Sequence, residues 1–471
     1  MSALLKLKHL ILGTIIGASL GVLIIPAISI FFAQERLLSL LIMIPFALLL
    51  ALPPLLAIYK KEFDPFEPIY LWIILYAFLY LLKPLTHVIT GVGFRYGGEY
   101  LNEALLIAIV GLAFFYLGYF WGVGKKIAEK LPVVAKEISL KKLRWIAWAL
   151  ILLGFWGLHT YIQISGGWFE FWSKPHGFGG KASITTAYIY QLPELMIVGF
   201  ILLFFAVVTS GKISRVKNLL LLSIAGAGGV GLYTLIWGSR TNFSWLLISC
   251  VVLYYASKKR RPSLGASFTV LIFLFLALIT IPTYRGYVYF GGDFQKILDM
   301  GNYTRSLRQA FGNPTDEFGS YLAEVALVPE DVPYDYFALH RQLIYHPIPR
   351  LIWPDKPPLF NRNWDSFLAK SHLSWGAAES LLGDFYAQLG IWGIMIGTFI
   401  SGVLWKTIYW YFKRDENNMG AMIIFAVVLP NMFTYLAQGS AIAILKWLPY
   451  MMPSTVLAIF LSRKIGRSAK S

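Results

Sequence analysis

The chain has almost no cysteine and few charged side chains. Its one cysteine, Cys250, lies in an apolar run, so a disulfide within the chain and a cysteine-based metal site are both excluded. Charged residues occupy 14% of the 471 positions, whereas soluble domains carry roughly 25%. Hydrophobic residues occupy 57%, and the mean hydropathy is +0.63. This composition predicts an integral membrane protein that crosses the bilayer many times.

Motifs for nucleotides and metals are also absent from the sequence. There is no P-loop, no G-x-G-x-x-G that opens a helix after a strand, and no H-E-x-x-H. We therefore expect no cofactor, no metal and no cytoplasmic domain that binds ATP or a nucleotide sugar. The formal net charge of +17 invites a nucleic-acid interpretation. The placement of the basic residues explains this charge better, so we expect no nucleic-acid partner.

Long apolar runs dominate the chain. A membrane-spanning helix needs roughly 20 apolar residues, and about twelve runs of helical length occur. They cover residues 9–32, 37–59, 66–84, 101–124, 144–165, 187–209, 218–237, 242–257, 266–284, 384–412, 419–436 and 440–462. The sequence therefore predicts an all-α polytopic fold with about twelve transmembrane helices. The first run is too long for the apolar region of a signal peptide, which favours a spanning helix.

Basic residues alternate between the loops on the two sides of these helices. One set of loops holds about 24 Lys and Arg residues, and the opposite set of short loops holds about 5. Because Lys and Arg accumulate in cytoplasmic loops, this bias predicts that both termini are cytoplasmic. The protein is then a multi-pass protein of the cytoplasmic (inner) membrane, and its longest loop faces outward.

The longest loop covers residues 285–383. It separates nine predicted transmembrane helices in residues 1–284 from three in residues 384–471. Prolines punctuate the loop, four of its segments have the pattern of short helices, and aromatic residues are frequent. We expect a large, folded helical extracytoplasmic cap rather than a disordered tether.

Two arginines at predicted outer helix ends are candidate binding residues. Arg240 follows Gly238-Ser239, and Arg285 precedes Gly286. A guanidinium holds two phosphate oxygens at once, so a pair of arginines on rigid helix ends can clamp a diphosphate. The alternative is that each arginine anchors its helix at the membrane interface.

The outer loop and its end supply candidate acid–base groups. His340 and His346 can take up a proton near neutral pH as a residue type, and Arg341 and Arg350 lie beside them in the sequence. Asp384 begins the tenth predicted helix, where a carboxylate can act as a general base, orient a sugar hydroxyl or pair with an arginine. Its alternative role is a helix N-terminal carboxylate that the macrodipole favours. Glu379 is a nearby rival.

Short motifs follow one another in a recognisable order. Gly-Ser-Arg at 238–240 precedes Arg285-Gly286, then Ile-Pro-Arg-Leu-Ile-Trp-Pro-Asp-Lys-Pro at 348–357, then Gly-Asp-Phe-Tyr at 383–386 and Leu-Gly-Ile-Trp-Gly at 389–393. This order resembles the oligosaccharide repeat-unit polymerases, the Wzy-type O-antigen and exopolysaccharide polymerases. That family usually shows Glu, an aromatic residue, Asn and Phe before the last glycine pair. The sequence departs from this pattern at Asp384 and Gln388-Leu389. This departure bears on the role expected of Asp384 more than on the resemblance to the family.

The resemblance implies a glycosyltransferase of the membrane class that uses lipid-linked donors (GT-C type). Such an enzyme moves a growing glycan from a polyprenyl (undecaprenyl) diphosphate onto a new lipid-linked repeat unit at the outer face of the membrane. The family fold is all-helical, with an outer-loop lid over a cavity. The expected partners are the lipid-linked donor and acceptor, the bilayer and a chain-length regulator.

The site residues are assigned on the same basis. Arg240 and Arg285 are expected to hold the donor diphosphate, and Arg341 and Arg350 the second diphosphate or the glycan. Asp384, His340 or His346 is expected to act as the base of an inverting, metal-independent transfer.

Two alternative functions stay open. One is an O-antigen-type ligase that transfers the glycan to another acceptor, and the other is a transporter or flippase of lipid-linked sugar.

Overall fold

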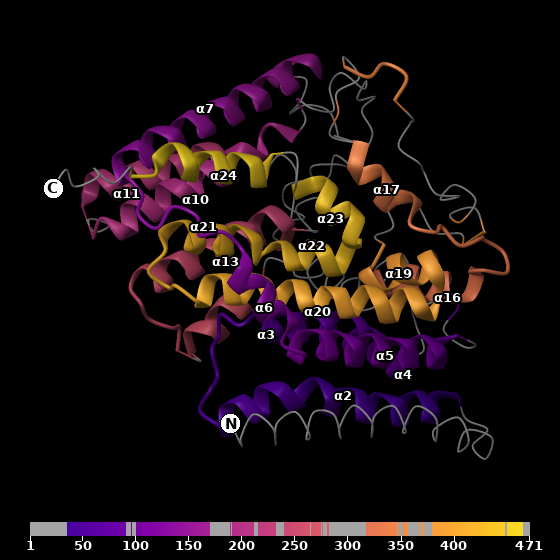
Figure 1. The fold of residues 1–471 in the computed structure, drawn as a ribbon. Helices are drawn as coiled ribbons and strands as arrows, with labels where there is room; N and C mark the ends of the chain where they lie inside the picture. The colour runs from indigo at the N-terminus through magenta and orange to yellow at the C-terminus, as the bar shows by residue number, and fades with distance from the viewer. Residues whose placement is uncertain are drawn as a thin grey trace. The chain divides into compact units, whose positions relative to one another are not determined.

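The structure is a computed structural model, and the elements of its described part are helices joined by turns and irregular segments (Figure 1). The residues described are 35–90, 96, 100–169, 189, 191–211, 215–231, 240–263, 265–274, 276, 280–281, 317–345, 348, 352–356, 367, 370–371, 379–447 and 450–464. Within them the only β-type pairing is an isolated antiparallel bridge between Ile138 and Arg463. The all-α prediction is confirmed for this part of the chain.

Six of the described helices are long and apolar enough to cross a membrane. They are Leu37–Tyr59, Pro68–Ile89, Leu101–Phe120, Leu140–Ile164, Ile391–Lys413 and Met419–Gln438. Five shorter apolar helices cover Glu194–Thr209, Val216–Gly231, Thr241–Ser257, Gly265–Leu274 and Met451–Ser462. The chain is therefore a helical membrane protein. The predicted span 9–32 lies outside the described residues, so the total of about twelve stays a prediction.

The chain divides into two compact units. Unit 1 comprises Met1–Lys130, Gln309–Trp410 and Met432–Leu445, and unit 2 comprises Leu131–Arg308, Tyr411–Asn431 and Lys446–Ser471. Each unit therefore combines segments that lie far apart in the sequence.

Unit 1 contains the long helices that frame the site described below. Its elements are α2 (Glu35–Tyr59), α3 (Pro68–Ala77), the π-helix η1 (Phe78–Leu82), α4 (Lys83–Thr90), α5 (Leu101–Phe120), α6 (Val123–Lys130), α16 (Glu317–Leu327), α17 (Ala338–Tyr345), α19 (Leu381–Leu389), most of α20 (Ile391–Lys413) and α22 (Asn431–Gln438), and the start of α23 (Ser440–Trp447). α3, η1 and α4 follow one another without a break and form one spanning segment.

Glycines allow α5 and α20 to approach until their backbones touch. A Cβ atom on Gly118 of α5 would collide with the carbonyl oxygen of Phe399 on α20. A Cβ atom on Gly402 of α20 would collide in turn with the carbonyl oxygen of Phe115 on α5. Small residues at such crossings let membrane helices gain van der Waals contact along their backbones. This reciprocal pair fixes where the two helices meet.

Buried tyrosines connect the other helices of unit 1. Tyr76 of α3 donates a hydrogen bond to the carbonyl oxygen of Ala108 at 2.7 Å, and Tyr321 of α16 donates to that of Ala104 at 2.9 Å. Tyr116 of α5 donates to the carbonyl oxygen of Leu49 on α2 at 3.2 Å. Each side chain fills the core with its ring and satisfies its hydroxyl on a neighbouring helix, as a buried tyrosine must.

The two ends of α5 contact different parts of unit 1. At the start of α5, Ala104 meets α16 through Tyr321. At the end of α5, Tyr119 donates to Glu67, which also pairs with Lys406 of α20. Tyr119 lies fifteen residues after Ala104 along α5, or about 22 Å at 1.5 Å per residue. The basic loops around Lys60 and Lys125 thus lie at the end opposite α16.

The predicted helix at 384–412 is two helices rather than one. α19 ends at Gly390, whose φ of 61° places it in the left-handed region that favours glycine. α19 then packs back on the beginning of α20, because the ring of Phe385 lies where a Cβ of Gly397 would be. Hydropathy did not reveal the turn, since both segments are apolar. Asp384 therefore belongs to a separate short helix that precedes the spanning helix.

Unit 2 is built around a buried helix. Its elements are α7 (Leu140–Ile164), α10 (Glu194–Thr209), α11 (Val216–Ser223), η2 (Ile224–Gly231), α13 (Arg240–Ser257), α21 (Met419–Val428) and α24 (Met451–Ser462). α10 contacts α7, α13, α21 and α24. A Cβ on Gly154 of α7 would lie 2.7 Å from the side chain of Met196, so α7 and α10 also meet at a glycine.

Replacing Gly118 by alanine tests the crossing of α5 and α20. The added methyl group collides with a backbone oxygen that cannot rotate away, so we expect a loss of about 1–3 kcal/mol of stability. Thermal unfolding of the purified protein in detergent measures this loss.

Gly228→Ala is the matched control, because nothing lies within 4 Å of the Cβ that it would add. It should leave the unfolding temperature unchanged or raise it. Equal unfolding temperatures for the two variants would contradict the backbone contact.

Candidate functional site

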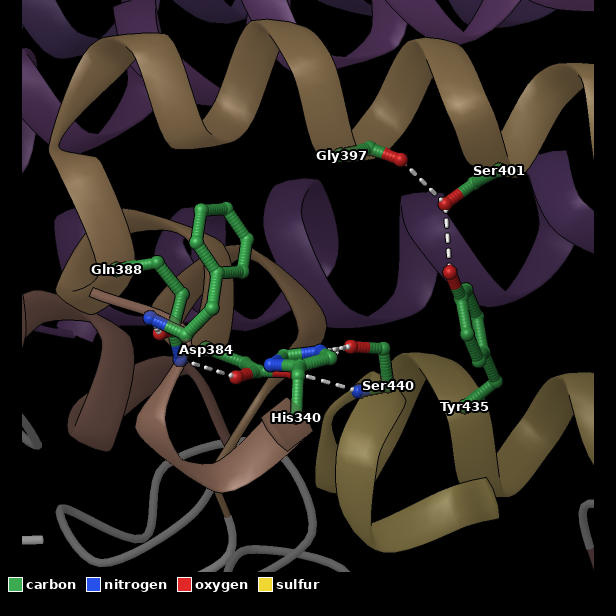
Figure 2. A network of polar contacts seen from close by, with 8 residues as sticks. His340, Asp384, Gln388, Gly397, Ser401, Tyr435 and Ser440 are labelled. Carbon is green, nitrogen blue, oxygen red and sulfur yellow. Dashed lines mark hydrogen bonds and ion pairs between the residues drawn. The ribbon is translucent and has the colours of Figure 1, made fainter. Parts of the chain in front are cut away.

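Asp384 is the centre of a buried polar cluster in unit 1 (Figure 2). It lies in the first turn of α19, whose N-cap Ser380 accepts a hydrogen bond from the backbone N–H of Gly383 at 3.2 Å. Gly383 leaves room for the carboxylate of Glu324, which occupies the space of a Cβ there. The Asp384 side chain is 1% exposed. A carboxylate so far from water needs hydrogen bonds to both oxygens.

Those hydrogen bonds come from the start of α23 and from α19 itself. The backbone N–H and the hydroxyl of Ser440 donate to Asp384 Oδ2 at 2.8 and 2.7 Å. The amide of Gln388, one turn further along α19, donates to Oδ1 at 3.1 Å. Gly439, with a φ of 84°, separates α22 from α23 and turns the first N–H of α23 towards the carboxylate. The positive end of the α23 dipole thus stabilises the negative charge of Asp384.

His340 joins the cluster through the same serine. Its Nε2 atom lies 2.7 Å from Ser440 Oγ and 4.0 Å from Asp384 Oδ2. The Ser440 hydroxyl has a single proton, and it donates that proton to Asp384. Ser440 Oγ must therefore accept from His340, which assigns the proton of a neutral imidazole to Nε2. Nδ1 then carries a lone pair; it is a buried atom, and no described group hydrogen-bonds to it.

An unusual backbone turn presents His340 to the cluster. Tyr336 and Phe337, just before α17, have φ values of 45° and 59° in the left-handed region that such residues rarely adopt. Two hydrogen bonds to α19 hold the turn: Phe337 N donates to Gln388 Oε1 at 2.5 Å, and Asp335 N donates to the carbonyl oxygen of Ala387 at 2.9 Å. Backbone strain of this kind is concentrated at functional sites.

The Gln388 side chain therefore makes two hydrogen bonds that connect different parts of the site. Its amide nitrogen donates to Asp384, and its amide oxygen accepts from Phe337. The side chain is fully buried, and its two bonds connect the carboxylate to the turn that carries the histidine. It is a positioning residue for both groups.

A second pair of hydroxyl groups lies further along α20 and α22. Ser401 donates to the carbonyl oxygen of Gly397 at 2.7 Å, so the hydroxyl of Tyr435, also at 2.7 Å, donates to Ser401 Oγ (Figure 2). The ring centroids of Trp72 and Trp405 lie 6.3 and 6.2 Å from the ring centroid of Tyr435. These contacts hold α22 against α20 and thereby fix the start of α23.

The structure thus brings two of the predicted acid–base residues together, His340 and Asp384. Arg341 follows His340 on α17 and is exposed. Arg240 is the first residue of α13 in unit 2, and its side chain lies outside the described part. Arg285, His346 and Arg350 also lie outside the described residues.

Two further residues near the site were considered from the sequence. Glu379, the rival carboxylate, is 5% exposed and precedes the N-cap of α19. Tyr386, the last residue of the Gly-Asp-Phe-Tyr motif, is 8% exposed. Burial, and then the charge of Glu103, raise the pKa of Tyr386 above its ordinary value, so it is a neutral phenol at physiological pH.

Ser440 and Gln388 were missed as site residues in the sequence. Ser440 stands at the start of the apolar run 440–462, where it resembles an ordinary helix-start residue. Gln388 appeared only as a departure from the family pattern. The one available signal was the spacing of Asp384 and Gln388, since residues four apart share a helix face.

A family model described as a domain of unknown function (DUF8712) matches residues 313–461. No curated protein and no solved structure matches the chain. The matched segment contains His340, Asp384, Gln388 and Ser440, whereas Arg240 and Arg285 lie outside it.

Replacing Asp384 by asparagine tests the hydrogen-bond pattern. The new amide removes the negative charge at the start of α23 and cannot accept all three bonds, so we expect a loss of about 2–3 kcal/mol in stability. Thermal unfolding in detergent measures it.

Asp355→Asn makes the same chemical change at an exposed position and should leave the unfolding temperature within a degree or so of wild type. An equally small effect of Asp384→Asn would show that the buried carboxylate does not hold the cluster together.

Proposed function

We propose that the protein polymerises polyprenyl-diphosphate-linked oligosaccharide repeat units at the outer face of the cytoplasmic membrane. In this proposal it is an inverting, metal-independent glycosyltransferase of the class with lipid-linked donors. It has about twelve transmembrane helices, cytoplasmic termini and residues 285–383 as an extracytoplasmic lid. The motif order from Arg240 to Gly393 supports it, together with the six apolar helices of a membrane protein.

The observation that carries the proposal is the chain of contacts from His340 through Ser440 to Asp384. Glycosyl transfer to a hydroxyl needs a base that removes the hydroxyl proton. Both carboxylate oxygens of Asp384 already accept hydrogen bonds from Ser440 and Gln388, so Asp384 is not that base. His340 has an acceptor nitrogen, Nδ1, and its other nitrogen is held by Ser440. Asp384 is then the group that, through Ser440, orients the histidine.

The reaction follows from these roles. The acceptor hydroxyl transfers its proton to His340 Nδ1 while its oxygen forms a bond to the anomeric carbon of the donor glycan. The bond from that carbon to the diphosphate oxygen breaks, and polyprenyl diphosphate leaves with the electron pair. Attack from the face opposite the leaving group inverts the anomeric centre. The proton on His340 Nδ1, a buried atom, afterwards passes to water that enters the site as the products leave.

The diphosphate leaving group is negatively charged, and arginine side chains can stabilise that charge. Arg240 and Arg285 are proposed to hold the donor diphosphate, and Arg341 and Arg350 to steer the second diphosphate or the glycan. A fixed cation at a developing negative charge stabilises the transition state more than the ground state. The partners in this proposal are the two lipid-linked glycans, the bilayer and a chain-length regulator.

His340→Ala tests the base. General base catalysis contributes typically 10²–10⁴-fold, so the purified variant, supplied with lipid-linked repeat units, should form polymer slower by about that factor. His159→Ala is the control, because His159 is exposed in unit 2 and bonds only to Trp168 among the described residues. Wild-type polymer formation in His340→Ala would remove this residue from the mechanism.

Ser440→Ala tests whether the Ser440 hydroxyl orients the His340 imidazole or only stabilises the fold. Without the hydroxyl, nothing fixes the Nε2 proton, so the pH dependence of the rate should change while the protein stays monodisperse. Ser440→Thr, which keeps a hydroxyl, should restore the wild-type profile. A rate loss with an unchanged pH profile would assign Ser440 a structural role alone.

Arg240→Ala and Arg285→Ala test the diphosphate clamp. Loss of one stabilising donor costs about 10²–10³ in rate in other enzymes, so each variant should make no detectable polymer at an unchanged level in the membrane. Lysine at either position should rescue only part of the rate, because an ammonium cannot bind two oxygens in a fork. Normal chain lengths in either alanine variant would exclude that arginine.

A transporter of lipid-linked sugar is the second candidate, favoured by one observation. The break at Gly439 leaves the N-terminus of α23 against a buried carboxylate, and interrupted helices of this kind occur at the binding sites of transporters. Sealed vesicles that move lipid-linked sugar without a new glycosidic bond would support it. A glycan ladder made without added acceptor supports the polymerase instead, and a product that forms only with a separate acceptor supports a ligase.

A further inference from the structure

Unit 1 contains a cavity of about 450 Å³ at the end opposite Asp384. The second half of α2, the start of α3, the end of α5 and the beginning of α6 form its walls, together with Lys406 and Trp410 near the end of α20. Its volume lies in the usual range of ligand pockets, roughly 300–1,000 Å³. None of the residues assigned to glycosyl transfer lines it.

One wall of the cavity is apolar and lies on a helix that faces outward. α2 contributes Leu49, Leu52 and Leu56, and α5 contributes Phe120. Leu55 on the same stretch of α2 is 61% exposed, so this helix borders the surface of the described unit. An apolar wall beside an exposed membrane helix suits a hydrocarbon chain.

The polar part of the cavity has more positive than negative groups. Three lysines and two glutamates line it. Lys406 lies 2.6 Å from Glu67, which also accepts from Tyr119, so this pair is already neutralised. Glu62 is exposed at the rim.

Lys60 and Lys125 remain as the cations available to a ligand. Neither makes an ion pair within the described part of the chain. The Nζ atom of Lys125 lies 4.5 Å from the ring centroid of Trp410, which also lines the cavity. The two lysines suit the anionic headgroup of a lipid, and the apolar wall beside them suits its hydrocarbon chain.

We propose that this cavity binds one anionic glycerophospholipid, with its phosphate at Lys60 and Lys125 and the upper part of an acyl chain along α2. The two lysines belong to the basic loops that the sequence assigns to the side where anionic headgroups attract Lys and Arg. The site lies about 22 Å from the start of α5 by helix length, so it is separate from the proposed reaction. It does not depend on the glycosyl-transfer proposal.

Retention of lipid by the purified full-length protein tests this site. The protein is reconstituted in nanodiscs with phosphatidylglycerol or phosphatidylcholine, extracted in mild detergent and measured by native mass spectrometry. Wild type should keep one phosphatidylglycerol and no phosphatidylcholine. Lys60→Gln with Lys125→Gln should weaken retention about thirty-fold, because each basic group near a membrane surface contributes a factor of about five.

The matched control is Lys61→Gln with Lys126→Gln, which removes the same charge from the adjacent exposed residues that do not line the cavity. It should retain the lipid like wild type. Ala57→Trp fills the cavity and should abolish retention with both lysines in place, whereas Ala47→Trp, at an exposed position elsewhere on α2, should not.

Three results would overturn the proposal. They are equal retention of the two lipids, equal loss in the two double-lysine variants, and displacement of the lipid by millimolar inorganic phosphate, which would indicate an anion site without a hydrocarbon chain. Polymer synthesis is measured separately, so failure of one proposal leaves the other testable.

Discussion

A buried carboxylate at a helix N-terminus determines the arrangement of the site. Asp384 is almost fully shielded from water, and its charge is balanced by the N–H and hydroxyl of Ser440 and by the amide of Gln388. Removing any partner would leave an unsatisfied polar group in a low-dielectric interior. The carboxylate therefore fixes the start of α23, and through Gln388 it also fixes the turn at Phe337 that places His340.

Close helix contacts make this arrangement possible. At Gly118 and Gly402 the backbones of α5 and α20 touch, and buried tyrosines donate to carbonyl oxygens across α2, α3, α5 and α16. In a membrane, where hydrocarbon is as apolar as the side chains, such contacts and hydrogen bonds replace the hydrophobic effect as the force between helices. They hold together a compact unit 1, with the His340 cluster at one end and a lysine-lined cavity at the other.

Much of the fold could be predicted from the sequence, because apolar length is a local property. The predicted runs at 37–59, 101–124 and 144–165 agree closely with α2, α5 and α7. The break at Gly390 was not predicted, whereas the break at Gly439 falls between the predicted runs 419–436 and 440–462. Gly390 lies inside an apolar segment, and glycine adopts right-handed and left-handed conformations about equally readily, so the residue type alone does not locate the turn. His340 and Asp384 were selected by residue type, but Ser440, 56 residues after Asp384, had no local signal.

The sequence by itself determined the class of molecule, a polytopic helical membrane protein, and the residue types able to carry acid–base chemistry. Composition and periodicity suffice for this, since each spanning helix must satisfy its own backbone and present apolar side chains to lipid. The tertiary structure alone decided which of those residues meet. It buried Asp384 with hydrogen bonds to both carboxylate oxygens, left Nδ1 of His340 without a described hydrogen-bond partner, and brought Lys60 and Lys125 to one cavity. These outcomes depend on contacts between distant segments, which no local pattern encodes.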